Sequence, residues 1–282
     1  MRYGIAINSA RCMACYACFM ACKDEHCGWD TTVSKAQPHM GQFWMNIREW
    51  ERGDNERRIK TATVPTPCSH CSNPACAQAA TVEGAVYRRD DGIVIIDPEK
   101  AKGQKQIVDA CPIGAIYWNE ELDIPQKCTM CAHLLDDPDY PGKEPRCVEA
   151  CPNQALIFGD LDDPDSEISR AIAAGKVTQL SGLEGQDTSV VHLNVPTVFL
   201  AGTVCLPEDD EVAIGAHVRA TCDECGTVFE METNWAGDWE FEDLPRNKPF
   251  TVEISMDGCK TAVYHVTTDT DHYVDLTVLE KA

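Results

Sequence analysis

The sequence lacks the features that define several large classes of protein. It has no apolar run of eighteen residues, so we expect no membrane-spanning helix. No positively charged segment followed by an apolar run stands at Met1, so we expect no signal peptide of its own. It also has no Gly-rich phosphate loop and no nucleophile elbow. The common nucleotide-binding and hydrolase classes are therefore disfavoured.

Positive charge is scarce. The chain has 24 Lys and Arg against 46 Asp and Glu, which gives a formal net charge of −22. Nucleic-acid binding depends on Lys and Arg facing phosphates, so a nucleic-acid partner is not expected. A protein partner should instead offer a basic or neutral surface.

Cysteine, in contrast, is abundant, with 17 in 282 residues. The chain is too long for a small disulfide scaffold. Its first run, Cys12-x2-Cys15-x2-Cys18-x3-Cys22, has the spacing of bacterial ferredoxins, in which the fourth thiol ligates a different cluster. Zinc sites use pairs of cysteines two residues apart rather than a triple plus one. The run therefore predicts at least two iron–sulfur clusters.

Three further runs complete the pattern. We expect each run to give its fourth cysteine to a partner run, the outer runs pairing with each other and the inner runs likewise. Three [4Fe–4S] clusters follow, with these ligand sets: Cys12, Cys15, Cys18 and Cys151; Cys68, Cys71, Cys76 and Cys111; Cys128, Cys131, Cys147 and Cys22. A fourth cluster would need cysteine at four places where the chain has Ala80, Ala101, Gln104 and Ile107. We expect apolar volume to fill that vacated site, because a void is costly.

The remaining pattern predicts an α+β chain of three segments. Residues 1–158 form a ferredoxin-like polycluster domain with an internal repeat, in which Ala110–Ile116 echoes Ala150–Leu156. Residues 159–194 form an acidic helix, capped by aspartate and ended by Gly175, and a linker. Residues 195–282 contain seven short strand patterns, which is typical of an immunoglobulin-like sandwich.

Local patterns add three elements to the first domain. Arg2–Asn8 alternates polar and apolar residues and predicts a strand. A tight loop and a short helix are expected over Met13–Lys23. Two β-rich runs, 85–89 and 93–96, flank Asp90-Asp91-Gly92 and predict a hairpin.

Five cysteines fall outside the ligand sets, and we interpret them as spare thiols: Cys27, Cys205, Cys222, Cys225 and Cys259. The acidic residues between Cys222 and Cys225 should raise the pKa of both thiols, which argues against a reactive pair. A zinc site would require the strands to bring Cys205 and Cys259 beside them.

Other side chains have two open interpretations. Phe43, Trp44 and Trp50 suit either a strand pair packed over the cluster core or an anchor for a partner subunit. We expect His26, His70 and His133 to be solvated or to donate a hydrogen bond, in preference to ligating a cluster. Other residues near the ligand runs could adjust cluster potentials, and so could two of these histidines: His70, His133, Lys23, Lys127 and Arg146.

In the spacing of its cysteine runs, Met1–Val195 resembles the iron–sulfur subunits of molybdopterin oxidoreductases of the dimethyl-sulfoxide-reductase type. Those subunits usually bind four clusters, and the chain departs from them at the vacated site. Nearly the whole chain is similar to the small subunits of pyrogallol–phloroglucinol transhydroxylases, which have three clusters and an appended β-sandwich. The segments that carry this resemblance include Phe43–Ile47, Gly84–Tyr87, Asp97–Gly103, Tyr117–Glu120 and Gln126–Asp137.

The resemblance implies a non-catalytic electron-transfer subunit of a heterodimer. The large subunit would hold a molybdenum or tungsten bis-pterin cofactor and a polyhydroxylated aromatic substrate. The reaction would be transhydroxylation or reductive dehydroxylation of a catechol, the latter needing an external electron donor. A cytoplasmic location is expected, with co-export alongside a twin-arginine-bearing partner left open. The alternatives are a free-standing polyferredoxin whose β-domain serves for docking, or a scaffold whose clusters are structural staples.

Overall fold

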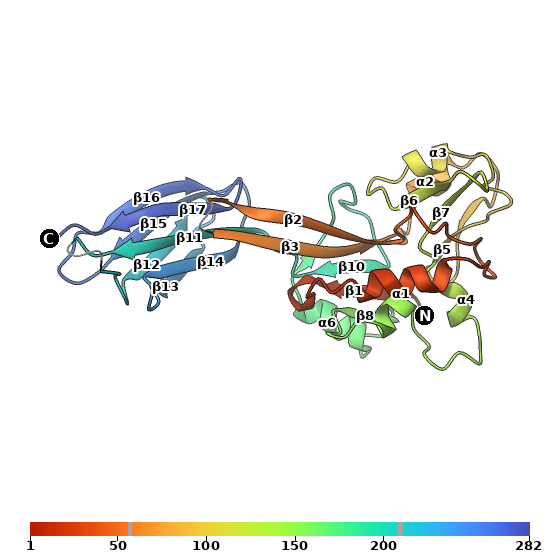
Figure 1. The fold of residues 1–282 in the computed structure, drawn as a ribbon, viewed down its shortest axis with the longest axis horizontal. Helices are drawn as coiled ribbons and strands as arrows, with labels where there is room; N and C mark the ends of the chain where they lie inside the picture. Colours follow the sequence, from red (N-terminus) through yellow and green to blue (C-terminus); the bar gives the residue numbers. More distant parts are fainter. Residues whose placement is uncertain (56–57, 208–210) are drawn as a thin grey trace. The chain divides into compact units, whose positions relative to one another are not determined.

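The computed structural model describes residues 1–55, 58–207 and 211–282, and these residues form two compact units (Figure 1). Unit 1 consists of Met1–Glu49 and Thr63–Val195, and unit 2 consists of Trp50–Ala62 and Pro196–Ala282. A few short helices accompany many strands, which confirms the α+β class.

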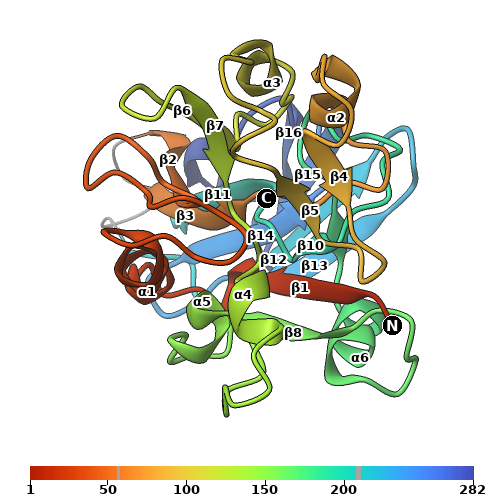
Figure 2. The same ribbon diagram turned by 90° about the vertical axis from the view of Figure 1, so that its right-hand side faces the viewer.

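Unit 1 is built on a four-stranded sheet with β1 (Tyr3–Asn8) in its interior. β8 (Leu156–Asp160) pairs with β1 antiparallel on one side. β10 (Val190–Leu193) pairs with it parallel on the other, and β9 (Val177–Thr178) forms the edge (Figure 2). The strand predicted over Arg2–Asn8 is confirmed, and burial of Ile5 and Ile7 explains its apolar positions.

The segment 159–194, predicted as an acidic helix and a linker, is part of unit 1. Strands β9 and β10 lie in its sheet, and α6 (Glu167–Ala174) packs the buried Ile168 against it. The helix ends at Gly175 as predicted, but its cap is Ser166, whose Oγ accepts from Ser169 N–H at 3.2 Å. Local periodicity does not reveal such pairing, since β1 and β10 are far apart in sequence.

Short elements carry the cysteine runs between these strands. β4 (Val86–Arg88) and β5 (Val94–Ile96) pair antiparallel, which confirms the predicted hairpin, and β6 (Ile116–Asn119) pairs with β7 (Ile124–Lys127). The helical elements are η1 (Ser9–Arg11), α1 (Ala17–His26), α2 (Ala75–Ala79), α3 (Gln106–Asp109), α4 (Ala132–Leu135) and α5 (Arg146–Glu149). No helix in the described ranges has the length and apolar character needed to cross a membrane.

A long hairpin of β2 (Met45–Asn55) and β3 (Arg58–Pro67) contributes residues to both units. Its part in unit 2 is held by Arg52, which is 5% exposed. The Arg52 guanidinium pairs with Asp271 at 3.1 Å and donates to the Thr197 carbonyl at 2.8 Å. This buried ion pair explains why the segment Trp50–Ala62 of the hairpin belongs to unit 2.

Unit 2 contains two sheets that share one core. The strands are β11 (Val198–Cys205), β12 (His217–Cys222), β13 (Val228–Glu232), β14 (Asp238–Leu244), β15 (Pro249–Ser255), β16 (Ala262–Thr267) and β17 (His272–Val278). Their orders are β14-β11-β17 and β13-β12-β15-β16. The seven strand patterns predicted for residues 195–282 correspond to these seven strands.

Candidate metal centres

One group of thiols comprises Cys68, Cys71, Cys76 and Cys111. Burial raises the pKa of Cys71 to about 11, and the Cys68, Cys76 and Cys111 thiols add to the rise. Burial likewise raises the pKa of Cys76 to about 11, with contributions from Cys68 and Cys111. Thiols change one another's pKa in this way only when they lie close together. These four thiols are brought together by the loop before α2, by α2 itself and by the turn after α3.

A second group comprises Cys12, Cys15, Cys18 and Cys151. Burial raises the pKa of Cys18 to about 12, and the neighbouring Cys151, Cys12 and Cys15 thiols add to it. The same residues line one hollow in unit 1. Cys15 is exposed, whereas Cys18 is buried at the start of α1. Residues of the first and last cysteine runs therefore line the same hollow.

The third group comprises Cys22, Cys128, Cys131 and Cys147, all of them buried. Burial is the main cause that raises the pKa of Cys22 well above its usual value, and the neighbouring Cys128 and Cys131 thiols add to the rise. Burial also raises the pKa of Cys147 well above its usual value, with contributions from the neighbouring thiols of Cys131, Cys128 and Cys22. Cys22 thus lies with the 128–147 thiols although it belongs to the first run in sequence.

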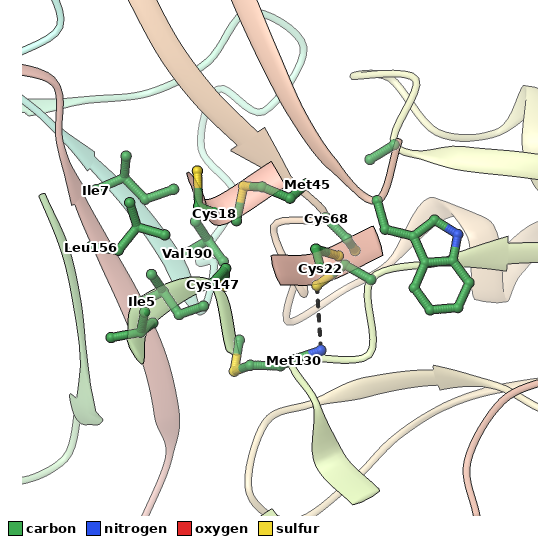
Figure 3. Close-up of a cluster of buried hydrophobic side chains, with 14 of the residues drawn as sticks. Ile5, Ile7, Cys18, Cys22, Met45, Cys68, Met130, Cys147, Leu156 and Val190 are labelled. Carbon is green, nitrogen blue, oxygen red and sulfur yellow. Dashed lines mark hydrogen bonds between the residues drawn. The ribbon is translucent and has the colours of Figure 1, made fainter. Parts of the chain in front are cut away.

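These three groups adjoin one another in a fixed order. Cys18 contributes to the raised pKa of both Cys22 and Cys147, which joins the second group to the third. Cys68 contributes after burial to the raised pKa of Cys128, which joins the third group to the first. Figure 3 shows Cys18, Cys22, Cys68 and Cys147 within one buried region. The Cys22 group therefore lies between the other two.

The loops around the thiols repeat one local geometry. The second residue after Cys12, Cys68 and Cys128 has a positive φ: Ala14 at 55°, His70 at 46° and Met130 at 53°. The His70 N–H donates to Cys68 Sγ at 3.5 Å, and the Met130 N–H donates to Cys128 Sγ at 3.3 Å (Figure 3). Left-handed residues aim successive N–H groups inward and form concavities that hold anions.

The two Cys-Pro turns repeat a second geometry. The Ala115 N–H donates to Cys111 Sγ at 3.2 Å, and the Ala155 N–H donates to Cys151 Sγ at 3.2 Å. The residue before each donor, Gly114 or Gln154, has a positive φ of 62° or 49°. Both sulfurs are thereby aimed by the same turn, which is the structural counterpart of the internal repeat.

The donor set fits iron–sulfur cores. Burial disfavours the thiolate at nearly every group member, so the protein alone does not activate these sulfurs as nucleophiles. A cationic metal core reverses that preference, because coordination deprotonates a thiol outright. Among the described residues, no three His, Cys, Asp or Glu side chains are arranged to hold a single metal ion. A cubane is larger than one ion, so its ligands stand farther apart.

Buried polar groups beside the thiols fit an additional acceptor. The Nδ1 of His70 accepts from Val94 N–H at 3.0 Å, so the proton is on Nε2, which is buried and has no partner among the described protein atoms. Burial, together with Lys127 and Arg88, holds the pKa of His70 well below its usual value. His26 Nε2 lies 3.5 Å from Cys131 Sγ. The solvent-exposed interpretation of these two histidines is therefore wrong.

The vacated site is filled as predicted. Ala101 and Ile107 are fully buried in a cluster with Val86, Val94 and Ile96, against which Ala80 also packs. The Gln104 side chain accepts from Thr81 N–H at 2.7 Å and donates to the Lys100 carbonyl at 2.6 Å. The four positions that lack cysteine thus meet in one packed region.

The spare-thiol interpretation of Cys222 and Cys225 is wrong, because these residues form a disulfide in the turn between β12 and β13. The turn holds the two Cα atoms 5.5 Å apart, which is within the range that a disulfide spans. Cys27, Cys205 and Cys259 are free thiols. Cys27 Sγ donates to the Gln37 carbonyl at 3.3 Å.

The aromatic and charged residues divide between the two interpretations. Trp44 is 1% exposed and packs against His26 with ring centroids 4.8 Å apart and the rings tilted by 44°, so it belongs to the core. Phe43 and Trp50 are 42% and 40% exposed, and the partner-anchor interpretation stays open for them. Glu25 joins His133 at 2.9 Å and Arg146 at 2.8 Å, a network that sequence reasoning missed because it spans more than a hundred residues.

Comparison with known proteins agrees with this geometry. Residues 59–161 match the family of 4Fe-4S dicluster domains. The chain is 37% identical over 266 residues to the pyrogallol hydroxytransferase small subunit of Pelobacter acidigallici, covering 91% of this chain and 92% of that protein. It is 30% identical to a subunit of the tetrathionate reductase of Salmonella typhimurium, covering 71% of this chain and 75% of that protein.

A third relative is one component of the anaerobic dimethyl sulfoxide reductase of Escherichia coli, with 32% identity over 57% of this chain and 75% of that protein. Each of the three relatives is one component of a larger oxidoreductase or transferase complex. The chain therefore belongs to the family of non-catalytic iron–sulfur electron-transfer subunits of molybdoenzymes that includes the pyrogallol hydroxytransferase small subunit.

Proposed function

We propose that this chain holds three [4Fe–4S] clusters and transfers electrons to or from a molybdenum or tungsten bis-pterin site in a catalytic partner subunit. The ligand sets are Cys12, Cys15, Cys18 and Cys151; Cys68, Cys71, Cys76 and Cys111; Cys22, Cys128, Cys131 and Cys147. When bound, the clusters supply one-electron steps. The chain's own residues bury the sulfurs, donate N–H groups to them and exclude water.

The single observation that carries this proposal is the grouping of the thiols. Cys12, Cys15 and Cys151 act on the pKa of Cys18, Cys68, Cys76 and Cys111 act on that of Cys71, and Cys22, Cys128 and Cys131 act on that of Cys147, which supports three sets of four thiols. A disulfide framework would pair thiols instead of gathering them in fours. The fourth set of positions has no thiol and is packed with apolar side chains.

We propose a polyhydroxylated aromatic compound as the partner's substrate. The support is the 37% identity to the pyrogallol hydroxytransferase small subunit, of which this chain covers 92%. Two reactions fit: transhydroxylation, which is redox-neutral overall, and reductive dehydroxylation of a catechol, which consumes electrons from a donor. The two differ in whether substrate oxidises the reduced clusters on every turnover.

The experiment is anaerobic purification through a tag on this chain, followed by stopped-flow absorbance. A large subunit that contains molybdenum or tungsten should co-purify. In the dithionite-reduced complex, a catechol should reoxidise the clusters steadily if the enzyme is a dehydroxylase. Pyrogallol should turn over without steady reoxidation if it is a transhydroxylase. A stable, cluster-loaded chain with no such partner would contradict the proposal and favour a free-standing polyferredoxin.

We further propose that unit 2 is an immunoglobulin-like sandwich that serves in assembly with the partner. Its two sheets enclose a core containing Trp239, Phe241 and Phe250. Gly202 on β11 supports the packing, since a Cβ there would lie 2.8 Å from the Trp239 ring. Residues 1–158 are proposed as the cluster-binding domain, and we propose the cytoplasm as its location, where the Cys222–Cys225 pair would be kept reduced.

A further inference from the structure

Lys127 is a buried cation whose hydrogen-bond acceptors among the described residues are backbone carbonyls. Its side chain lies at the end of β7 and is 3% exposed. The Nζ donates to the Val94 carbonyl at 2.5 Å and to the Cys128 carbonyl at 3.0 Å. In the part of the chain that the structure describes, no Asp or Glu oxygen lies within 4.0 Å of this Nζ. A buried ammonium is costly unless an opposite charge compensates it.

The position of this ammonium connects two thiol groups. On one side it contacts the carbonyl of Cys128, a member of the Cys22 group. On the other side it contacts Val94, whose N–H donates to His70 beside Cys68. Burial raises the pKa of the Cys76 thiol, and Lys127 opposes that rise more than any other neighbour. Lys127 also opposes the rise at Cys111 and Cys128.

In the remaining thiol group, Lys127 is not among the leading causes of the raised pKa of Cys12 or Cys18. The causes that act on Cys12 and Cys18 are burial, backbone N–H groups, neighbouring thiols and, for Cys12, Glu49. The charge of Lys127 is therefore placed asymmetrically, next to two of the three groups. Its natural counter-charge is the negative charge that a cluster with four thiolates carries.

We propose that the Lys127 ammonium is a shared positioning charge that raises the reduction potentials of the clusters at the Cys68 group and the Cys22 group. This inference rests on the proposed function. Reduction adds one electron and no proton to a cluster, so a nearby fixed positive charge stabilises the reduced form. Electrons that pass along the three groups are thus favoured on the two clusters that adjoin Lys127.

The test is a redox titration with dithionite, monitored by electron paramagnetic resonance, on the anaerobically purified complex. In K127Q the amide still donates a hydrogen bond but carries no charge. The Cys68 cluster should become at least tenfold harder to reduce, which is about 59 mV for one electron. The Cys22 cluster should shift in the same direction by less, and the Cys12 cluster should not shift.

Two further variants separate charge from structure. K127R keeps the positive charge and should stay close to the wild-type potentials. K105Q removes a lysine whose side chain is 65% exposed and should change none of them. Loss of iron from the two adjoining clusters in K127Q, but not in K127R, would also support the inference, because it would show that these clusters depend on the positive charge.

Several outcomes would overturn the inference. With full iron content in K127Q, unchanged potentials at both adjoining clusters would exclude the charge effect. An equal shift of all three clusters would indicate a general structural change. A wild-type complex without iron–sulfur clusters would instead contradict the proposed function, and the inference would fall with it.

Discussion

At the scale of single residues, the surroundings of the cysteines favour metal binding and disfavour a reactive thiolate. Burial and neighbouring thiols raise the pKa of Cys131 and Cys18 to about 12, far from the range of a reactive thiolate. The N–H groups that point at Cys68, Cys111, Cys128 and Cys151 stabilise negative charge on sulfur only once it is deprotonated. Iron is the group that completes this environment.

Cys18 and Cys22 give the sharpest test of ligand exchange between runs. Both lie on α1, one turn apart, yet they belong to different groups. C18S should remove the cluster of the Cys12 group, and C22S should remove the cluster that Cys128, Cys131 and Cys147 share. Each variant should lose about four iron atoms. Iron analysis with paramagnetic resonance would show which cluster is missing.

Loss of the same cluster in both variants would contradict the exchange. C27S is the matched control, because Cys27 follows the same helix but lies outside every group. It should keep the full iron content and all three resonance signals.

At the scale of elements, the vacated site shows how a cluster position becomes ordinary core. α3 still presents Ile107 one turn beyond Gln104, at the spacing of a ligand run. Hairpin β4–β5 supplies Val86, Val94 and Ile96 to fill the space. Apolar packing therefore supports this part of unit 1.

Truncation of the Ile107 side chain should lower the stability of unit 1. I107A deletes a fully buried side chain and should cost about 2–5 kcal/mol of stability through lost burial and a cavity. V82A, at a site 46% exposed on the same segment of the fold, should change stability by less than about 0.5 kcal/mol. Calorimetry of the loaded protein measures both, and an equal effect of the two substitutions would contradict the packed site.

The β12–β13 turn provides an independent element-scale prediction. The disulfide between Cys222 and Cys225 closes a very short loop, so its contribution to stability is about 2 kcal/mol by chain entropy. The double variant C222S/C225S should lower the unfolding temperature of oxidised protein and leave that of reduced protein nearly unchanged. Iron content should be the same in both forms. Iron loss in the double variant would mean that these cysteines are ligands after all.

Prediction from the sequence succeeded where the signal is local. The Asp-Gly turn and the strand alternation of unit 2 depend on neighbouring residues, and the elements they predict are present. It failed where distant segments meet. The parallel pairing of β1 with β10 and the contact of Lys127 with Val94 depend on tertiary packing, which leaves no periodic trace in the chain.

At the scale of the whole molecule, the order of the thiol groups matters most. The Cys22 group adjoins the Cys12 group through Cys18 and the Cys68 group through Cys128. Electrons would therefore enter at one outer group, pass through the buried middle group and leave at the other. A net charge of −22, together with the negative clusters, favours a partner with a basic or neutral docking face.

Anomalous diffraction at the iron edge from crystals of the anaerobically purified complex tests the central claim most directly. The account predicts three compact iron sites in this chain, at the Cys12, Cys22 and Cys68 groups, with the Cys22 group in the middle. An additional iron site beside Ala101 and Ile107, or no iron among Cys22, Cys128, Cys131 and Cys147, would contradict it.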